Sequence, residues 1–230
     1  MRGLLVTLEG LDGSGKGTQA GLLCQALAGR GVPVRQVSFP DYSHPSSALV
    51  KMYLNGEFGR EPGDVNAYAA SAFFAVDRYA SYRKYWKPAL DSGEVVLADR
   101  YTTSNMVYQL SKLPRQEWDA FLTWVEDFEY GKLGLPAPDL TLYLDMPPEL
   151  SEKLLEKRYQ GDEGKKDIHE RDEAYLHVCR ESAYYAARRL GWRMISCSEG
   201  NNPKTVEEIH REILGCLEES LRQRGGPEEK

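Results

Sequence analysis

Short apolar runs alternate along the chain with stretches in which apolar residues recur every three or four positions. The runs predict buried strands, and the helical spacing predicts amphipathic helices. The expected strands span residues 4–8, 34–39, 95–98, 140–144 and, more weakly, 193–197. The expected helices span residues 46–54, 64–86, 104–111, 117–128, 149–159, 171–190 and 205–224, besides an earlier one that carries Ala20, Leu23 and Leu27 on one face. Strands that are apolar throughout and alternate with helices indicate a parallel sheet covered on both faces.

Polar residues indicate where these elements are divided. Asp64 is a good N-cap residue, so we expect the long helix that ends near Trp86 to begin there. Residues 160–168 are polar and indicate part of a lid at about 158–171, and the tail 225–230 is expected to fray. No internal repeat or linker divides the sequence, so we expect a single domain over residues 1–230.

Composition excludes several classes of protein. The 230 residues are 41% apolar, enough for a sizeable core, and the formal net charge of −6 argues against a general nucleic-acid binder. A local anion site stays compatible with that charge. No apolar run approaches the ~18 residues that span a membrane or forms the ~7–15-residue core of a signal peptide. The four cysteines form no CxxC pair and the four histidines show no metal-ligand spacing, so we expect a reduced, cytoplasmic protein.

The sharpest motif lies between the first expected strand and the helix after it, where residues 10–16 match the phosphate-binding pattern GxxxxGK. Glycines allow successive backbone N–H groups to turn around phosphate oxygens, and the positive end of the helix points at the same anion. Lys16 adds a point charge on the terminal phosphates. The Ser or Thr that usually helps to hold Mg²⁺ is replaced by Gly17. The expected ATP-binding residues are Gly10, Leu11, Asp12, Gly13, Ser14, Gly15, Lys16, Gly17 and Thr18.

A second polar motif, Asp99-Arg100-Tyr101, directly follows an apolar strand. An aspartate at the carboxyl end of a parallel strand faces the ligand crevice, where it can hold Mg²⁺ or its water. Arg100 can clamp a phosphate through two parallel hydrogen bonds. We therefore expect Asp99 to bind Mg²⁺ or its water and Arg100 to bind a substrate phosphate.

The segments EGLDG at 9–13 and DRY at 99–101 resemble the EGxDG and DR[YH] motifs of thymidylate kinases, and the resemblance covers nearly the whole chain. It implies a three-layer P-loop NTPase fold with a five-stranded parallel sheet and a small lid. It also implies transfer of the γ-phosphoryl group of MgATP to dTMP, giving dTDP and ADP in dTTP biosynthesis. Family members are commonly homodimers, so we expect a homodimer that binds ATP and dTMP, with no nucleic acid or membrane partner.

The long helix carries candidate base-binding residues. Phe74 and Arg78 are one turn apart, so the ring could stack on a base while the guanidinium donates to a base carbonyl. In thymidylate kinases the matching Phe and Arg hold the thymine ring and its O4. Phe73 is expected in the core.

Residues after the Asp-Arg-Tyr motif complete the expected acceptor site. Asn105 has both a donor and an acceptor, which suits the imide edge of a pyrimidine, and Ser104 and Tyr108 lie beside it on a helix. Tyr108 could close the space that a ribose 2′-OH would need. By the same resemblance, Asp12 contacts the deoxyribose 3′-OH or the metal shell.

The resemblance also assigns Phe39 and the loop after it to the monophosphate. The arginine that the family commonly supplies in that loop is Tyr42 here, which leaves Arg100, helped by Lys51, as the expected grip on the phosphate.

Phosphoryl transfer also needs cations on the developing equatorial charge. Residues 11–14 of the phosphate loop contain no arginine, so the resemblance implies that the lid supplies one. Arg158 is the first candidate, ahead of Lys165, Lys166 and Arg171. With Lys16 and Arg100, it makes up the expected catalytic set.

Three alternatives stay open from the sequence. The chain could be a kinase of the same fold for dUMP, CMP or AMP, or a slowly hydrolysing nucleotide switch, although no NKxD guanine-reading motif occurs. It could also bind nucleotide without catalysis, as Gly17 would allow.

Overall fold

The computed structural model describes residues 2–159, 168–170 and 172–225, and within them five parallel strands form one sheet in the order β2-β3-β1-β4-β5. The strands are β1 (Leu5–Glu9), β2 (Val34–Ser38), β3 (Val95–Asp99), β4 (Leu140–Asp145) and β5 (Arg193–Ser196). The expected fold class, a five-stranded parallel sheet with helices on both faces, is thereby confirmed. Every residue of β1 is buried, as an apolar central strand requires.

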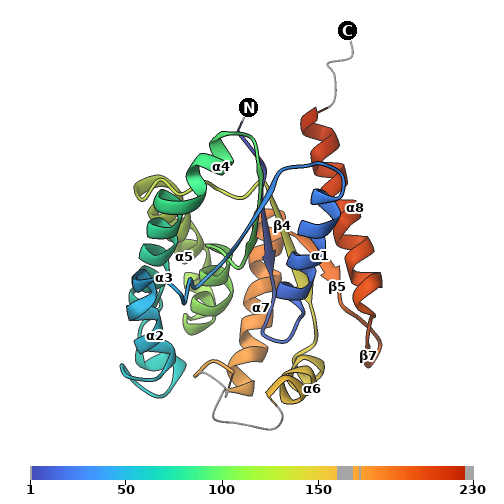
Figure 1. The fold of residues 1–230 in the computed structure, drawn as a ribbon. Helices are drawn as coiled ribbons and strands as arrows, with labels where there is room; N and C mark the ends of the chain where they lie inside the picture. The colour runs from blue at the N-terminus through green and yellow to red at the C-terminus, as the bar shows by residue number, and fades with distance from the viewer. Residues whose placement is uncertain (1, 160–167, 171, 226–230) are drawn as a thin grey trace.

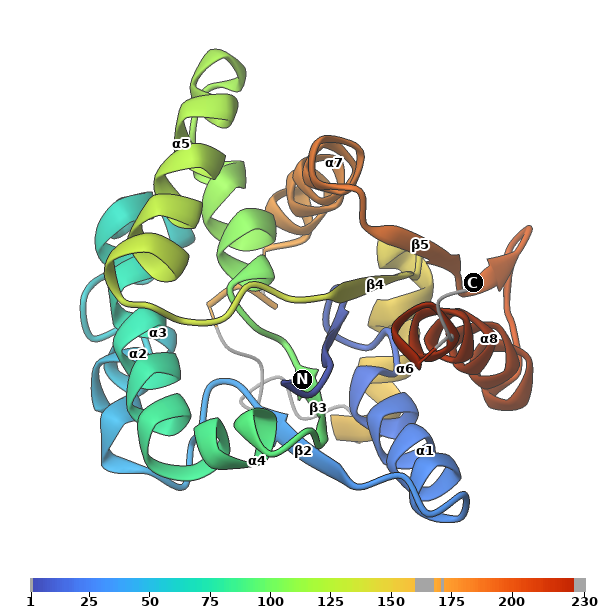
Figure 2. The ribbon, with the colours of Figure 1, turned by 90° about the horizontal axis from the view of Figure 1, so that it is seen from above.

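The helices cover both faces of this sheet (Figures 1 and 2). They are α1 (Lys16–Ala28), α2 (Ala48–Leu54), α3 (Ala67–Ser81), α4 (Lys87–Asp91), α5 (Trp118–Val125), α6 (Pro148–Tyr159), α7 (Glu173–Leu190) and α8 (Val206–Gly225). Seen from above, α1 and α8 lie on one side, and α3, α5 and α7 on the other. Successive side chains of β1 point to opposite faces of the sheet, so they join different hydrophobic clusters. Val6 and Leu8 pack with α1 and α8, whereas Leu5 packs with Trp86 on the opposite face.

The structure corrects two expected helix starts. Asn66, not Asp64, caps α3, and its side chain accepts a hydrogen bond from the Ala69 backbone N–H at 2.9 Å. Asp64 instead lies in a short 3₁₀ turn, where its carboxylate accepts from the N–H of Glu61. Helix α7 begins at Glu173 rather than at 171, with Asp172 as its N-cap. In each case the Asx side chain directly before the helix accepts a hydrogen bond from an N–H group of the first turn.

Three π-helical segments interrupt the regular winding of the described chain. They span Tyr82–Trp86, Asn105–Gln109 and Glu126–Lys132. The sequence also missed a small hairpin of β6 (Ser198–Glu199) and β7 (Asn202–Pro203). None of the described helices is both long enough and apolar enough to cross a membrane.

Candidate active site

The phosphate loop links β1 to α1 at the carboxyl edge of the sheet. Gly15 adopts a φ of 88° at the N-cap of α1, a left-handed conformation that favours glycine. At Gly10, an added Cβ would lie 2.8 Å from the Leu144 carbonyl oxygen, so a side chain there would collide with β4. These two glycines let the loop turn tightly against the sheet.

Six of the nine expected ATP-binding residues line a cavity of about 760 Å³: Asp12, Gly13, Gly15, Lys16, Gly17 and Thr18. The other three lie behind this surface. The side chains of Leu11 and Ser14 are buried, and Gly10 contributes a carbonyl oxygen to a hydrogen bond with Lys16.

Lys16 is almost fully buried, and its ammonium group donates to the carbonyl oxygens of Gly10 at 2.9 Å and Leu11 at 2.8 Å. Burial lowers the pKa of Lys16, and the charge of Arg100 lowers it further, while nearby carboxylates act in the opposite direction. A phosphate that bound Lys16 would replace these loop carbonyls as its partner.

Asp99 ends β3 beside the first turn of α1. A Cβ added at Gly17 would lie 3.3 Å from Asp99 Oδ2, so a hydroxyl at position 17 would stand next to this carboxylate. The described residues contain no cluster of three or more histidine, cysteine, aspartate or glutamate side chains suited to a metal. One carboxylate oxygen still fits Mg²⁺, which keeps several waters and takes its other ligands from substrate phosphates.

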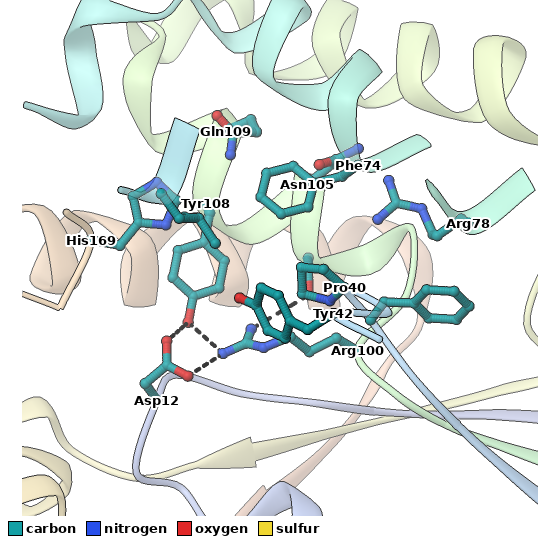
Figure 3. Close-up of a pocket in the computed structure, with 13 residues that line it drawn as sticks. Asp12, Pro40, Tyr42, Phe74, Arg78, Arg100, Asn105, Tyr108, Gln109 and His169 are labelled. Carbon is teal, nitrogen blue, oxygen red and sulfur yellow. Dashed lines mark hydrogen bonds and ion pairs between the residues drawn. The ribbon is translucent and has the colours of Figure 1, made fainter. Parts of the chain in front are cut away.

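Arg100 joins the phosphate loop to the segment after β3 (Figure 3). Its guanidinium donates to Asp12 Oδ1 at 2.6 Å and to the Tyr108 hydroxyl at 3.2 Å, and it lies 3.4 Å from Glu9 Oε1. Burial tends to raise the pKa of Asp12, but the charges of Arg100 and Lys16 outweigh it and hold that pKa well below its usual range. Asp12 is therefore ionised at neutral pH.

Glu9, the first residue of the EGLDG segment, is a buried carboxylate to which the sequence motifs assigned no role. It accepts hydrogen bonds from the hydroxyls of Thr103 at 2.9 Å and Ser104 at 2.7 Å, and from the N–H of Gly10 at 3.0 Å. Ser104 is therefore tied to the phosphate loop through Glu9. The available indication was a charged residue at the end of a strand that is otherwise apolar.

A second, narrower cavity of about 80 Å³ adjoins the first, and it holds the expected acceptor residues. Its lining includes Asp12, Phe39, Phe74, Arg78, Arg100, Ser104, Asn105 and Tyr108. Of the residues that the sequence assigned to the acceptor, the structure brings all of these together and leaves out Lys51. Phe74 meets the ring of Tyr53 edge-on, with the centroids 6.2 Å apart.

Arg78 and Asn105 share one buried partner, Glu129. Arg78 donates through Nε at 2.7 Å and through Nη2 at 2.6 Å, and the Asn105 amide nitrogen donates at 2.8 Å. All three side chains are almost fully buried. This internal pairing was not foreseen, since the sequence predicted only contacts between Arg78, Asn105 and a base.

The far wall of the narrower cavity comes from Tyr108 and His169. Their rings stack at 5.4 Å with an angle of 15° between the planes. The Tyr53 hydroxyl lies 2.7 Å from His169 Nε2 and accepts from Lys112 Nζ at 2.7 Å. Burial lowers the pKa of His169 to about 3, and the charge of Lys112 adds to this effect, so His169 is neutral at pH 7.

Four further residues that were named from the sequence differ in how they lie relative to the two cavities. Phe39 packs on Tyr101 with centroids 5.9 Å apart, whereas Tyr42 is half-exposed and lines both cavities. Lys51 lies on α2 and lines neither cavity. Phe73 packs against the core cluster around Val50, as expected.

The expected lid lies mostly beyond the part of the chain that the structure describes. This holds for Lys165, Lys166 and Arg171, and for the side chain of Arg158, whose backbone belongs to α6. Among the described residues of this segment, Ile168 packs against α2 and donates its N–H to the Leu54 carbonyl oxygen at 3.4 Å.

Comparison with known proteins agrees with this geometry. Residues 8–213 match the family model for thymidylate kinase. A thymidylate kinase from Mycobacterium tuberculosis is 33% identical over 192 residues, which cover 82% of this chain and 87% of that protein. A probable thymidylate kinase from Thermococcus gammatolerans is 29% identical over 223 residues, covering 95% of this chain and 98% of the relative.

A solved structure of a thymidylate kinase from Candida albicans shares the fold. The TM-score is 0.71 at 24% sequence identity, with 96% of this chain and 93% of the other covered. With a family model that spans most of its length and a relative at 33% identity, the chain belongs to the thymidylate kinase family.

Proposed function

We propose that this protein transfers the γ-phosphoryl group of MgATP to dTMP, giving dTDP and ADP. The observation that carries the proposal is that Asp12 and Arg100 line both cavities, the wide one at the phosphate loop and the narrow one at the base-binding residues. Two nucleotides in these cavities would meet end to end at this pair. Family membership supplies the identity of the two nucleotides.

In the proposed mechanism, Lys16 leaves its loop carbonyls and, with the loop amides, binds the ATP phosphates. Arg100 binds the acceptor phosphate, whose oxygen attacks the γ-phosphorus as the bond to the ADP oxygen breaks. No strong general base is needed, because a phosphate monoester oxygen is already ionised at neutral pH. Mg²⁺, when bound, supplies charge neutralisation for the phosphates, and Asp99 would hold it.

Base recognition in this proposal comes from the narrow cavity. Phe74 stacks on the thymine ring, and Arg78 and Asn105 bind its imide edge. Tyr108 fills the space beside the deoxyribose that a 2′-hydroxyl would need. Its hydroxyl already donates to Asp12 Oδ2 at 3.1 Å, which supports a fixed position for the ring.

We further propose a single kinase domain over residues 1–230, with a lid at about 158–171 that supplies Arg158 and excludes water. The cytoplasmic location and the homodimer rest on the family resemblance. Helix α3 has an apolar outer face, formed by the exposed side chains of Tyr68, Val76 and Tyr79. This face supports a contact surface for the second subunit of the proposed homodimer.

An enzyme-linked assay of ADP release, with ATP fixed and dTMP, dUMP, dCMP, AMP and GMP as acceptors, tests the proposal. We expect Mg²⁺-dependent turnover that is fastest with dTMP. A clear preference for AMP would contradict the assignment of the base to Phe74, Arg78 and Asn105.

A further inference from the structure

Glu129 contacts neither cavity directly, yet it holds two side chains that do. It lies in the π-helical segment Glu126–Lys132, its side chain is completely buried, and its carboxylate accepts from Arg78 and Asn105. Arg78 and Asn105 both belong to the lining of the narrow cavity (Figure 3), in which Phe74 and Asn105 lie across from Asp12.

The contacts of Asn105 fix the direction of its amide. The amide nitrogen donates to Glu129 Oε1 at 2.8 Å and to the Ser71 carbonyl oxygen at 3.3 Å. The Glu129 carboxylate, which lies beside a guanidinium, can only accept hydrogen bonds, and so can the Ser71 carbonyl oxygen. The reverse orientation of the Asn105 amide would therefore place its oxygen against two other oxygens. The polar atom of Asn105 that remains for a ligand is therefore the acceptor Oδ1.

The contacts of Arg78 fix a donor beside that acceptor. Its Nε and Nη2 are committed to Glu129, and Nη1 lies 3.3 Å from the Tyr101 carbonyl oxygen. Nη1 and Nη2 each keep one N–H beyond these contacts, so the guanidinium still offers a donor to a ligand.

We propose that Glu129 is a positioning residue that sets the hydrogen-bond polarity with which the site reads a pyrimidine, an inference that rests on the proposed function. With Glu129 accepting from both side chains, the edge offers a donor from Arg78 and an acceptor from Asn105. A thymine or uracil imide, with a carbonyl oxygen beside an N–H, matches this order. Cytosine carries an amine beside an unprotonated ring nitrogen, so it meets a donor with a donor and an acceptor with an acceptor.

Gln109 shows why the fixed pair matters. Its side chain lines the same cavity, and its Oε1 is buried without a hydrogen-bond partner among the described residues. No neighbour sets the direction of this amide, so it can turn to suit either base. Arg78 and Asn105, which Glu129 holds in place, therefore have to distinguish the imide edge of thymine or uracil from the amine edge of cytosine.

The test is the variant Glu129→Gln, with kcat and KM measured for dTMP, dUMP and dCMP. Glutamine offers one oxygen where glutamate offers two, so it cannot accept from both Arg78 nitrogens and also hold Asn105. We expect the ratio of kcat/KM for dTMP over dCMP to fall by about tenfold or more, mainly through the KM for dTMP. The dTMP over dUMP ratio and the KM for ATP should stay within about twofold, because both bases share the imide edge and ATP binds elsewhere.

Glu126→Gln is the matched control, since it makes the same chemical change in the same π-helical segment at a residue outside both cavities. Glu129→Asp keeps a carboxylate beside Arg78 but shortens its reach, and it decides the question if Glu129→Gln does not fold. Folding is checked by circular dichroism and by ATP affinity.

An unchanged dTMP over dCMP ratio in either folded variant would overturn the inference. So would a wild-type protein that phosphorylates dTMP and dCMP equally well, a result that leaves the proposed kinase activity standing. A wild-type protein with no activity on dTMP would instead contradict the proposed function itself.

Discussion

The phosphate end and the base end of the site hold their cations in opposite ways. At the phosphate end, Lys16 is bound to carbonyl oxygens of its own loop, and the Arg100–Asp12 pair keeps 15% and 29% of its side-chain surface exposed. At the base end, Arg78 and Glu129 form an ion pair with 1% and 0% exposed. The Arg100–Asp12 pair, which must admit a substrate phosphate, is partly exposed to water, whereas the Arg78–Glu129 pair is closed off from water. Lys16 is buried as well, but its partners are carbonyl oxygens that a phosphate can replace.

The largest expected effects concern catalysis at the phosphate end. Lys16→Met should lower kcat/KM by about 10³, because a cation aimed at the transferring phosphates is lost. The free energy of unfolding should not fall, since the ammonium group is costly to bury. Steady-state kinetics and urea unfolding of the same preparation measure both. A loss of stability as large as the loss of activity would mean that Lys16 belongs with the structural cations.

Arg158→Ala should lower kcat by about 10³ and leave dTMP binding nearly intact, because the lid cation acts on the transition state. Rapid-quench measurement of the chemical step, together with dTMP titration, checks this. An unchanged kcat would remove Arg158 from the mechanism.

The two ion pairs should differ in their effect on stability. Arg78→Met should lower the free energy of unfolding by about 3–5 kcal/mol, because Glu129 would be left buried without its partner. The matched variant Arg100→Met should lower it less, because Asp12 keeps 29% of its side chain exposed and Glu9 keeps its hydrogen bonds from Thr103 and Ser104. Urea unfolding at pH 7 compares the two variants. Equal losses in the free energy of unfolding would contradict the proposed difference between the phosphate end and the base end of the site.

A smaller effect is expected for the metal. Gly17→Ser places a hydroxyl beside Asp99, after that side chain shifts by a few tenths of an ångström, and should lower the Mg²⁺ concentration for half-maximal activity by about threefold relative to Gly17→Ala. The alanine variant adds the same Cβ without the oxygen. The same Mg²⁺ dependence in both variants would show that Asp99 and water already satisfy the metal.

A pH dependence of stability is expected at Lys112, next to the base end. Burial lowers the pKa of Lys112 from its usual 10.5 to about 7. The unfolded chain therefore holds this proton between pH 7 and 10.5 while the folded chain does not, so this group makes the free energy of unfolding rise with pH across that window. Lys112→Met should abolish the rise. Denaturant unfolding of both proteins at pH 6.5 and pH 9 tests this, and parallel pH profiles would contradict it.

The features that could be predicted from the sequence are those that depend on residues close together in the chain. All five sheet strands lie where the sequence indicated them, and β1, β3 and β4 do so because a strand buried on both faces needs an apolar run. The edge strands β2 and β5 are mostly exposed, which explains their weaker apolar pattern. The phosphate loop could also be located, since its glycines and Lys16 are adjacent in the chain. The N-cap of α3 and the start of α7 were each misplaced by two residues, because the sequence does not show which Asx side chain reaches the N–H groups of the first turn.

The remaining residues of the site could not be read from local pattern. Glu129 is 51 positions from Arg78 and 24 from Asn105, and His169 is 116 positions from Tyr53. A lone glutamate on an amphipathic helix gives no indication that it will be sealed against an arginine. Only the packing of distant elements creates these contacts, and with them the second set of functional residues.

The π-helical segments have a consequence for how relatives of this chain are compared. A π turn holds one residue more than an α turn, and Asn105 and Glu129 each lie in such a segment. Deleting one residue there would restore ordinary α-helical winding and change which side chains of that turn face the cavity, while the helix beyond the turn would keep its orientation. A one-residue alignment gap at 105–109 or 126–132 would therefore mark a relative that reads its base by different means.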